Sequence, residues 1–351
     1  MKVFVGLSGG VDSAVSAALL QQQEHDVVGV FIRIALPGYP CSAGEDKISA
    51  QRVAAHLQIP FIEIDLSKEY ADNVFAYTIA ELAKGRTPNP DTLCNQKIKF
   101  GAFYEYARSH GADAVATGHY ARTKNGLLYK GVDTDKDQSY FLWMVPHEVL
   151  KHTMFPIGEM RKTDVRALAA KFDLPNAARP DSQGLCFLSD TSIDEMIRRE
   201  LEPLPGNVLD EAGTVVGRHD GAALYTMGQR HGFELFAHTP QTQPHFVIAK
   251  NNEANTITVS TERFPIKYKN TEVELAETNW IGVSEKGPCL ARFRYRQTLI
   301  PAVLQELNSR GSLAPAVTLQ EPHYVPYGQS LVLYQGQQCI GGGIVEKTRL
   351  C

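Results

Sequence analysis

The sequence predicts an α/β protein with a doubly wound parallel sheet in its N-terminal part, followed by two small β-rich domains, the last of them barrel-like. Strand-like and helix-like patterns alternate through the first half, which is typical of parallel sheets with right-handed crossovers. Beyond about Pro203 the helical periodicity stops, and short strand-like runs recur between turn signals. The 351 residues suffice for two or three domains, which we expect at residues 1–200, 201–266 and 267–351.

The expected elements of the first half follow from the spacing of apolar residues and from the residues that end each run. Residues 3–7 predict the first strand, and the alanine-rich stretch behind it a helix. Residues 27–34, VVGVFIRI, are apolar and β-branched, as in a strand buried on both faces. The remaining expected elements are, in order, a helix over 46–57, a strand over 61–66, a helix over 68–84 ended by Gly85, a helix starting near Asn95 and continuing over 100–110, and a strand over 113–119.

Composition excludes several classes of protein. No run of eighteen apolar residues occurs, and the first residues lack a basic-then-apolar leader, so we expect neither a membrane span nor a signal peptide. Six cysteines without any C-x-x-C pair argue against a zinc ribbon, a thioredoxin-type motif or a simple iron–sulfur site. We expect a monomer in the cytosol. The formal net charge is -4, so a nucleic-acid partner would need a local basic patch.

The segment GLSGGVDSAV joins the first strand to the first helix. This layout offers backbone N–H groups to an anion at a helix N-terminus, and Ser8 and Ser13 can donate to phosphate oxygens. It is neither a P-loop, because no lysine follows, nor a dinucleotide fingerprint. Asp12 beside phosphates implies a bridging cation. Because parallel strands share one carboxyl edge, Gly6, Ser8 and His119 are expected there. The alternative is an ordinary turn capped by Ser or Asp.

Two loops rich in helix breakers each carry a cysteine. In RTPNPDTLCNQKIKFG, Cys94 precedes the expected helix start, and Lys97 and Lys99 are close by, where thiolate character is expected. Asp91 in the same loop can serve as a general acid or base. Cys186 lies in ARPDSQGLCFL, and two such thiols can act as a nucleophile and its resolving partner. The alternative is that Cys94 is a small buried side chain in a turn.

The segment ARFRYRQ places three arginines at alternate positions. In an extended strand Arg292, Arg294 and Arg296 would share one face, with Tyr295 on the other. Three guanidinium groups on one face repel each other unless anions meet them, and phosphates are the obvious anions. The alternative is a solvated edge strand that charge protects from aggregation.

Seven segments together carry a family resemblance. They are GLSGGVDSAV, GRTPNPDTLCNQKIKFG, ATGHYAR, DKDQSYFL, DSQGLCF, GQRHG and RYRQ. In their order and spacing they resemble the bacterial tRNA-specific 2-thiouridylase family, a branch of the N-type ATP pyrophosphatases, over nearly the whole chain. Each motif alone is unspecific, whereas the combination is specific. The resemblance implies an adenine nucleotide alpha hydrolase-like fold for the first domain.

The resemblance also implies a reaction, the ATP-dependent 2-thiolation of the wobble uridine at position 34 of tRNA. ATP adenylates the C2 carbonyl oxygen, and sulfur from a cysteine persulfide then replaces that oxygen, releasing AMP and pyrophosphate. A urea-like carbonyl is a poor electrophile, which explains why ATP must activate it. The implied cofactors are ATP and Mg²⁺. The implied partners are tRNAs for Lys, Glu and Gln, and a sulfur-relay protein or cysteine desulfurase as persulfide donor.

Residue roles are carried over by the same resemblance. Cys186 matches the persulfide carrier, Cys94 the nucleophile that forms a transient disulfide with it, and Asp91 the acidic residue beside the base. The ATP-binding positions are Gly6, Leu7, Ser8, Gly9, Gly10, Val11, Asp12, Ser13, Ile32 and Gly118, with Asp12 also expected at Mg²⁺ and pyrophosphate. The tRNA-binding positions are Asn89, Pro90, Asp91, His119, Lys136, Asp137, Gln138, Arg294, Tyr295, Arg296 and Gln329. The chain departs from the family at Ile32, often Met, and at Ser49, commonly Asp.

Two rival functions remain. Another ATP pyrophosphatase, an amidotransferase or a ligase, would share the Ser-Gly-Gly turn, but it would lack the paired loop cysteines and the arginine segment. A non-catalytic RNA-binding protein with a vestigial nucleotide loop is the other rival. Intact Ser8, Asp12, Cys94 and Cys186 speak against it.

Overall fold

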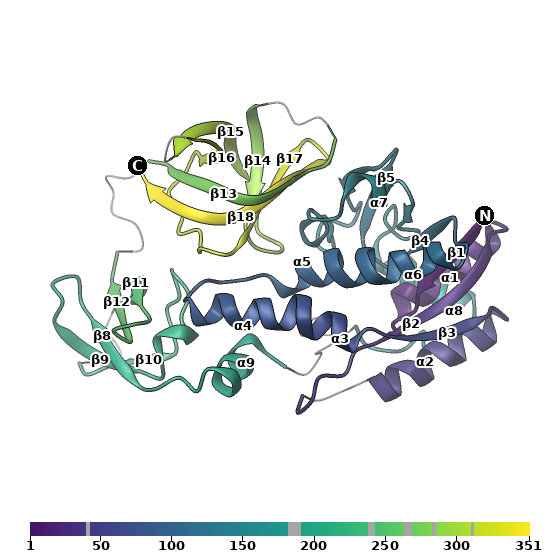
Figure 1. Cartoon of the computed structure of the whole chain (residues 1–351), viewed down its shortest axis with the longest axis horizontal. Helices are drawn as coiled ribbons and strands as arrows, with labels where there is room; N and C mark the ends of the chain where they lie inside the picture. Colours follow the sequence, from purple (N-terminus) through teal and green to yellow (C-terminus); the bar gives the residue numbers. More distant parts are fainter. Residues whose placement is uncertain (40–42, 182–190, 238–242, 263–268, 283–285, 310–311) are drawn as a thin grey trace.

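The N-terminal sheet is parallel, as the alternating pattern predicts. The computed structural model describes residues 1–39, 43–181, 191–237, 243–262, 269–282, 286–309 and 312–351 (Figure 1). Five strands run in the order β3-β2-β1-β4-β7, with β1 pairing in parallel to both β2 and β4. Their bounds are β1 Lys2–Gly6, β2 Asp26–Arg33, β3 Phe61–Asp65, β4 Ala114–Ala116 and β7 Thr153–Met154.

Helices cover both faces of this sheet, so the doubly wound class is confirmed. The helices α1 (Val11–Gln22), α2 (Ala43–His56) and α8 (Lys162–Lys171) pack on one face, where Val3 and Val5 of β1 are buried. On the other face, Phe4 belongs to a second cluster with residues 93–107. Alternate residues of β1 therefore point to opposite layers, as a strand buried on both sides requires.

The helix expected over 68–84 is one continuous run of α3 (Ser67–Tyr70), the π-helical η1 (Ala71–Phe75) and α4 (Ala76–Ala83). It stops before Gly85, whose φ of 75° lies in the left-handed region that favours glycine at a helix end.

The next helix begins earlier than expected, at Pro90 rather than near Asn95. The side chain of Asn89 accepts a hydrogen bond from the Thr92 backbone N–H, and proline occupies the first helical position. An Asn cap followed by Pro is a strong start signal. The run comprises α5 (Pro90–Cys94), the π-helical η2 (Asn95–Ala102) and α6 (Phe103–Ser109). Cys94 is thus inside a helix and not at its N-terminus.

The strand expected over 113–119 is shorter, because β4 ends at Ala116. A β-hairpin that the sequence pattern does not predict follows, with β5 (Ala121–Lys124) and β6 (Leu127–Lys130). The short elements η3 (Ser139–Phe141) and α7 (His147–Leu150) complete this part of the chain. None of the helices in the described ranges is both long and apolar enough to cross a membrane.

The second part is a small sheet in the order β10-β9-β8-β12-β11. Its core contains Val208, Val247 and Ile257, and helix α9 (Ile193–Glu200) packs against it through Ile197. The elements are β8 Gly206–Leu209, β9 Val215–His219, η4 Ala222–Leu224, β10 Phe233–Leu235, β11 Phe246–Asn251 and β12 Thr256–Ser260.

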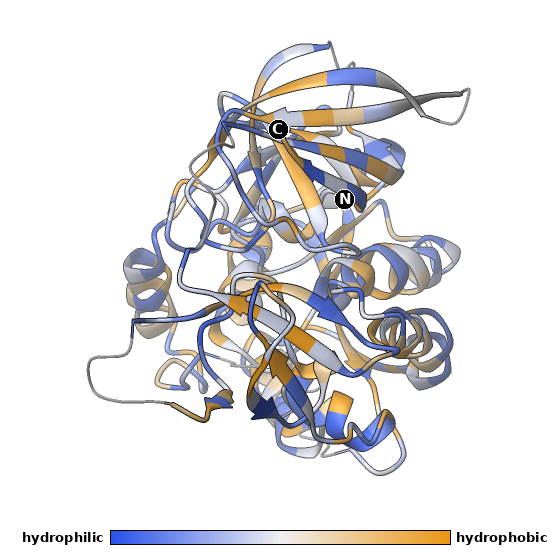
Figure 2. Cartoon of the chain, turned by 90° about the vertical axis from the view of Figure 1, so that its left-hand side faces the viewer, coloured by the Kyte–Doolittle hydropathy of each residue, from blue (hydrophilic) through white to orange (hydrophobic). Residues whose placement is uncertain are grey.

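The last part is a closed barrel, which confirms the expected architecture. Its strands run in the order β13-β16-β15-β14-β17-β18, and a further β13–β18 pairing closes the circle. Burial alternates along the first half of β13, as expected where one face of a strand points into a barrel; Figure 2 shows both hydrophobic and hydrophilic residues on the strands of the chain. The hairpin β5–β6 of the N-terminal part extends the barrel, with Leu128 opposite Cys339 of β18. The strands are β13 Thr271–Trp280, β14 Gly287–Arg292, β15 Ile300–Ser309, β16 Ser312–Leu319, β17 Ser330–Gln335 and β18 Gln338–Leu350.

The expected arginine face of ARFRYRQ is wrong. Strand β14 ends at Arg292, and the chain turns over residues 293–296, where Arg296 has a φ of 60°. Arg292 is buried, whereas Arg294 and Arg296 are exposed. A turn cannot keep the two-residue alternation of a strand, so the three guanidinium groups do not share one face.

Candidate nucleotide and RNA site

The Ser-Gly-Gly turn lies between β1 and α1, and hydrogen bonds between its own residues hold its backbone. The Ser13 hydroxyl accepts from the Ser8 backbone N–H at 3.2 Å and donates to the Gly10 carbonyl at 3.0 Å. Gly9 has a φ of 79°, which costs other residues more than glycine. No side chain caps α1, whose N-cap is Gly10. The alternative of a turn capped by Ser or Asp is therefore wrong, and the first turn of α1 can offer N–H groups to an anion.

Three donors converge on the Gly9 carbonyl and fix the turn from outside. They are Ser49 Oγ at 2.8 Å, Asn176 Nδ2 at 2.9 Å and Arg179 Nη1 at 3.1 Å. Arg179 also pairs with the Asp46 carboxylate. Ser49, a departure from the family pattern, thus serves as one of the supports of this turn.

Asp12 belongs to a charged cluster beside the same turn. Its carboxylate accepts from Lys162 Nζ at 2.8 and 2.9 Å and from the Tyr120 hydroxyl at 2.9 Å. Burial and the Asp12 charge raise the pKa of Tyr120. Both oxygens of the Asp12 carboxylate take part in these bonds. The described residues contain no group of three or more metal-ligating side chains.

Asp181, which lies near the end of the N-terminal part in the sequence, belongs to the same charged cluster. It pairs with Lys162 at 2.8 Å, Lys136 at 2.9 Å and Arg166 at 2.6 Å. Burial alone would raise the pKa of Asp181, but hydrogen bonds from Lys162 and Lys136 lower it well below its ordinary value. Lys162, Arg166, Arg179 and Asp181 are not predicted from the sequence. The available signal was that Arg179 and Asp181 belong to the segment ARPDSQGLCFL, which also carries Cys186.

Gly118 lies against the first turn of α1, next to the turn as expected. A Cβ placed on Gly118 would come within 2.7 Å of the Asp12 carbonyl carbon and the Ser13 backbone nitrogen. Only glycine therefore allows this close approach. Ile32 is buried near the end of β2, in the same hydrophobic cluster as Phe103.

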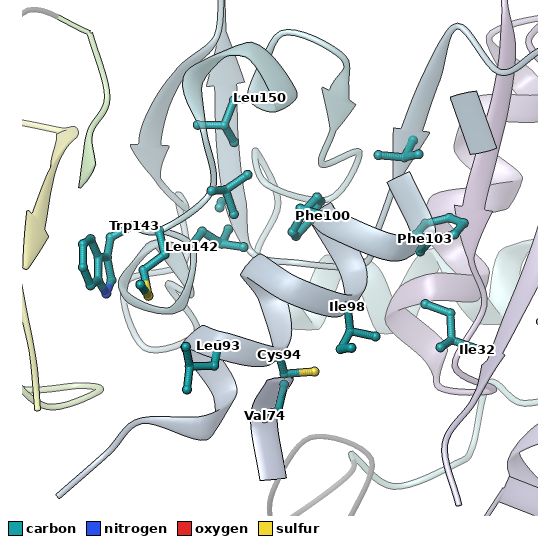
Figure 3. Close-up of a cluster of buried hydrophobic side chains, with 14 of the residues drawn as sticks. Ile32, Val74, Leu93, Cys94, Ile98, Phe100, Phe103, Leu142, Trp143 and Leu150 are labelled. Atoms are coloured by element: carbon teal, nitrogen blue, oxygen red, sulfur yellow. The ribbon is translucent and has the colours of Figure 1, made fainter. Parts of the chain in front are cut away.

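Of the two cysteines expected in the site, only Cys94 lies within the described residues. Cys94 is fully buried in the hydrophobic cluster that also contains Val74 and Ile98 (Figure 3). Asp91, three residues earlier, is half-buried in the first turn of α5. Cys186 lies outside the described residues, so its pairing with Cys94 stays a prediction. The burial of Cys94 agrees with the structural alternative for this residue, although it lies in a helix and not in a turn.

His119 is buried rather than displayed to a partner. Its Nδ1 is 2.7 Å from the Thr117 hydroxyl, and its ring centre is 5.9 Å from the rings of both Phe100 and Phe155. Burial, aided by the charge of Lys99, lowers the pKa of His119 well below its usual value. The imidazole is therefore neutral near pH 7 and offers no charge to a phosphate.

The expected base-contacting segment meets the barrel. Asn89 Nδ2 lies 3.3 Å from Gln329 Oε1, and the Tyr140 hydroxyl donates to the same oxygen at 3.0 Å. Pro90 follows Asn89 as the first residue of α5. The structure thus brings together Asn89 and Gln329, which are 240 positions apart and were both expected at RNA.

The segment Lys136 to Gln138 lies beside the arginine turn but is engaged within the protein. Lys136 pairs with Asp181, the Asp137 carboxylate is buried against Arg292, and Gln138 Oε1 accepts from the Tyr120 backbone N–H. Asp137 keeps only 4% of its surface exposed, and its expected contact with RNA stays a prediction.

The turn after β14, residues 293–296, carries the exposed side chains of Arg294 and Arg296. Arg296 Nε donates to the Asp135 carbonyl at 3.1 Å, and the ring of Tyr295 lies 4.8 Å from that of Phe141. These contacts bind the turn to the N-terminal part of the chain. Arg294 and Arg296 present exposed cations next to an aromatic pair, a combination suited to an RNA backbone and its bases.

Comparison with known proteins gives matches along almost the entire chain. Residues 1–190, 194–261 and 270–345 match three family models, described as tRNA methyl transferase HUP domain, tRNA methyl transferase PRC-barrel domain and aminomethyltransferase beta-barrel domain. The tRNA-specific 2-thiouridylase MnmA of Enterococcus faecalis is 40% identical, over 99% of this chain and 96% of its own length. The tRNA-specific 2-thiouridylase MnmA of Francisella philomiragia is 41% identical, over 98% of this chain and 99% of its own length.

Among solved structures, an NMN synthetase from Francisella tularensis covers 56% of this chain and 71% of its own, at 18% identity and a TM-score of 0.34. This likeness is too distant to inform the function.

Proposed function

The chain belongs to the tRNA-specific 2-thiouridylase family, and on that premise we propose that it catalyses the ATP-dependent 2-thiolation of the wobble uridine, position 34, of tRNA. The observation that carries the proposal is the 40% identity to a relative of that name across 99% of the chain. The open first turn of α1 supports it, because it suits the phosphates of ATP.

The proposed first step activates the base. The C2 oxygen of the uridine attacks the α-phosphate of ATP, so that pyrophosphate leaves and a carbon–oxygen–AMP linkage forms. Residues 8–13 and Gly118 would hold the nucleotide, with Ile32 on the adenine side. Asn89, Pro90 and Asp91 would hold the base. Mg²⁺ would accompany the ATP phosphates, with Asp12 beside it as the resemblance implies.

The proposed second step transfers sulfur. The terminal sulfur of a Cys186 persulfide attacks C2 and displaces AMP. The Cys94 thiolate then attacks the Cys186 sulfur, which cleaves the sulfur–sulfur bond, releases 2-thiouridine and leaves a Cys94–Cys186 disulfide. A thiol reductant returns the two cysteines to the thiol state. Since Cys94 is buried here, the step requires that its thiol become accessible when substrate binds.

The proposal assigns the remaining partners as follows. A cysteine desulfurase or a sulfur-relay protein would load Cys186, and tRNAs for Lys, Glu and Gln would be the substrates. Lys136, Gln138, Gln329 and the exposed arginines of the β14 turn would line the RNA surface. The protein would act as a cytosolic monomer.

The experiment combines the chain with tRNA, ATP, cysteine and a cysteine desulfurase, followed by mass spectrometry of the digested nucleosides and measurement of AMP. We expect 2-thiouridine and AMP from the unmodified chain. Cys94→Ala and Cys186→Ser should give no 2-thiouridine while still binding ATP. Cys351→Ser, which changes an exposed cysteine, is the matched control and should retain the activity.

Three outcomes would contradict the proposal. A methylated nucleoside in place of a thiolated one would indicate the methyl transferase activity that the description of the matching family model names. Turnover of ATP with a small amine acceptor and without tRNA would favour another ATP pyrophosphatase. Binding of tRNA without any nucleotide turnover would favour a non-catalytic RNA-binding protein.

A further inference from the structure

Lys162 directs its ammonium group at two carboxylates beside the nucleotide turn. Its Nζ lies 2.8 and 2.9 Å from the two oxygens of Asp12 and 2.8 Å from Oδ1 of Asp181. An ammonium has three N–H donors, so these contacts use all of them. Asp12 is the second residue of α1, and no side chain caps this helix. The ammonium of Lys162 is therefore next to the open N–H groups that suit a phosphate.

Both carboxylates keep other partners if Lys162 leaves them. Asp12 also accepts from the Tyr120 hydroxyl, while Asp181 also pairs with Lys136 and Arg166. The cost of leaving a carboxylate without any partner is thus avoided. The Lys162 side chain is 14% exposed, and its flexible four-carbon stem can turn to a new anion nearby.

We propose that Lys162 is a phosphate-binding residue of the nucleotide site. In the free chain Asp12 and Asp181 hold its ammonium in place, and on arrival of ATP the ammonium exchanges one of these carboxylates for a phosphate oxygen. The inference rests on the proposed function, in that ATP is the nucleotide. It explains why an acidic residue stands in a phosphate-binding turn, since Asp12 positions the cation that the phosphates use.

The test compares affinities for three ligands by isothermal titration calorimetry, namely ATP, inorganic pyrophosphate and adenosine. Lys162→Met removes the charge and keeps most of the stem. We expect its affinity for ATP and pyrophosphate to fall about 10- to 100-fold, the effect of one charge-assisted hydrogen bond, with adenosine binding unchanged. Lys162→Arg should recover part of the loss. Lys171→Met, at the exposed other end of α8, is the matched control and should bind all three ligands normally.

Two results would overturn the inference: unchanged ATP affinity in Lys162→Met, or equal losses for ATP and adenosine, which would mean a structural role only. Should Lys162→Met fail to fold, Lys162→Gln takes its place, because its amide can still donate to Asp12. Failure of the proposed function can be distinguished from failure of this inference. A chain that binds ATP through Lys162 but does not thiolate tRNA refutes the function alone, whereas normal ATP binding by the variant refutes this inference alone.

Discussion

The guanidinium of Arg292, at the end of β14, lies 2.5 Å from the carboxylate of Asp137 in the N-terminal part of the chain, and both side chains are buried. Arg292 also donates to the Tyr334 hydroxyl at 2.7 Å, while Asp137 accepts from the backbone N–H groups of Gly131 and Ser139 at 3.1 Å. This pair joins the barrel to the N-terminal domain directly before the turn that carries Arg294.

Breaking the pair on one side should destabilise the junction strongly. Arg292→Met leaves a buried carboxylate without its cation, and we expect a loss of about 3–5 kcal/mol in the free energy of unfolding. The double variant Arg292→Met with Asp137→Asn should lose less free energy of unfolding than Arg292→Met alone, because no charged carboxylate is left buried. Urea unfolding followed by the fluorescence of Trp143 and Trp280 measures both. A loss below about 1 kcal/mol in the single variant would show that water compensates the pair.

Arg294 is expected to contact the tRNA backbone. Since its side chain is exposed on the turn after β14, Arg294→Ala should weaken tRNA binding and lower the slope of log affinity against log salt by about one. Filter binding across a salt series gives the slope. Arg52→Ala, which changes an exposed side chain of α2, is the control with an unchanged slope. An unaltered slope in Arg294→Ala would remove this residue from the phosphate contacts.

Gly118→Ala should impair the nucleotide turn. The added Cβ would meet the backbone of Asp12 and Ser13 at 2.7 Å, so the two segments must separate, at a cost of about 1–3 kcal/mol. We expect weaker ATP binding by calorimetry and a lower melting temperature. Gly44→Ala, where nothing lies within 4 Å of the new Cβ, is the control and should be neutral or slightly stabilising. Normal ATP affinity in Gly118→Ala would show that the loop adapts.

His119 should make stability depend on pH in the mildly acidic range. Burial lowers its folded-state pKa below the unfolded value of 6.5, so the unfolded chain binds more protons between these two values. The contribution of His119 to the free energy of unfolding is thus fully present above pH 6.5. It is lost as the pH falls from 6.5 toward the folded-state pKa. His219 has the same sign. Unfolding free energies at pH 7.5 and 5.5 should therefore differ less in His119→Asn than in the unmodified chain, and an equal difference would contradict this account.

Local signals predicted much of this molecule. Apolar runs predicted β1, β2 and β3, and the glycine turn was placed correctly between the first strand and α1. One helix start was missed although its signal is local, because Asn89 and Pro90 were assigned to a loop. The strand assigned to ARFRYRQ failed because alternation of arginines is also compatible with a turn.

The sequence by itself determined the first strands and helices, the parallel N-terminal sheet, the β-rich C-terminal half and the family, because periodicity and motif spacing are properties of neighbouring residues. Only the tertiary structure decided which charges meet. Lys162 reaches Asp12 across 150 positions and Arg292 reaches Asp137 across 155. Such pairs form where strand ends converge at one edge of a sheet or where two domains join, and no local pattern records which distant side chain arrives there.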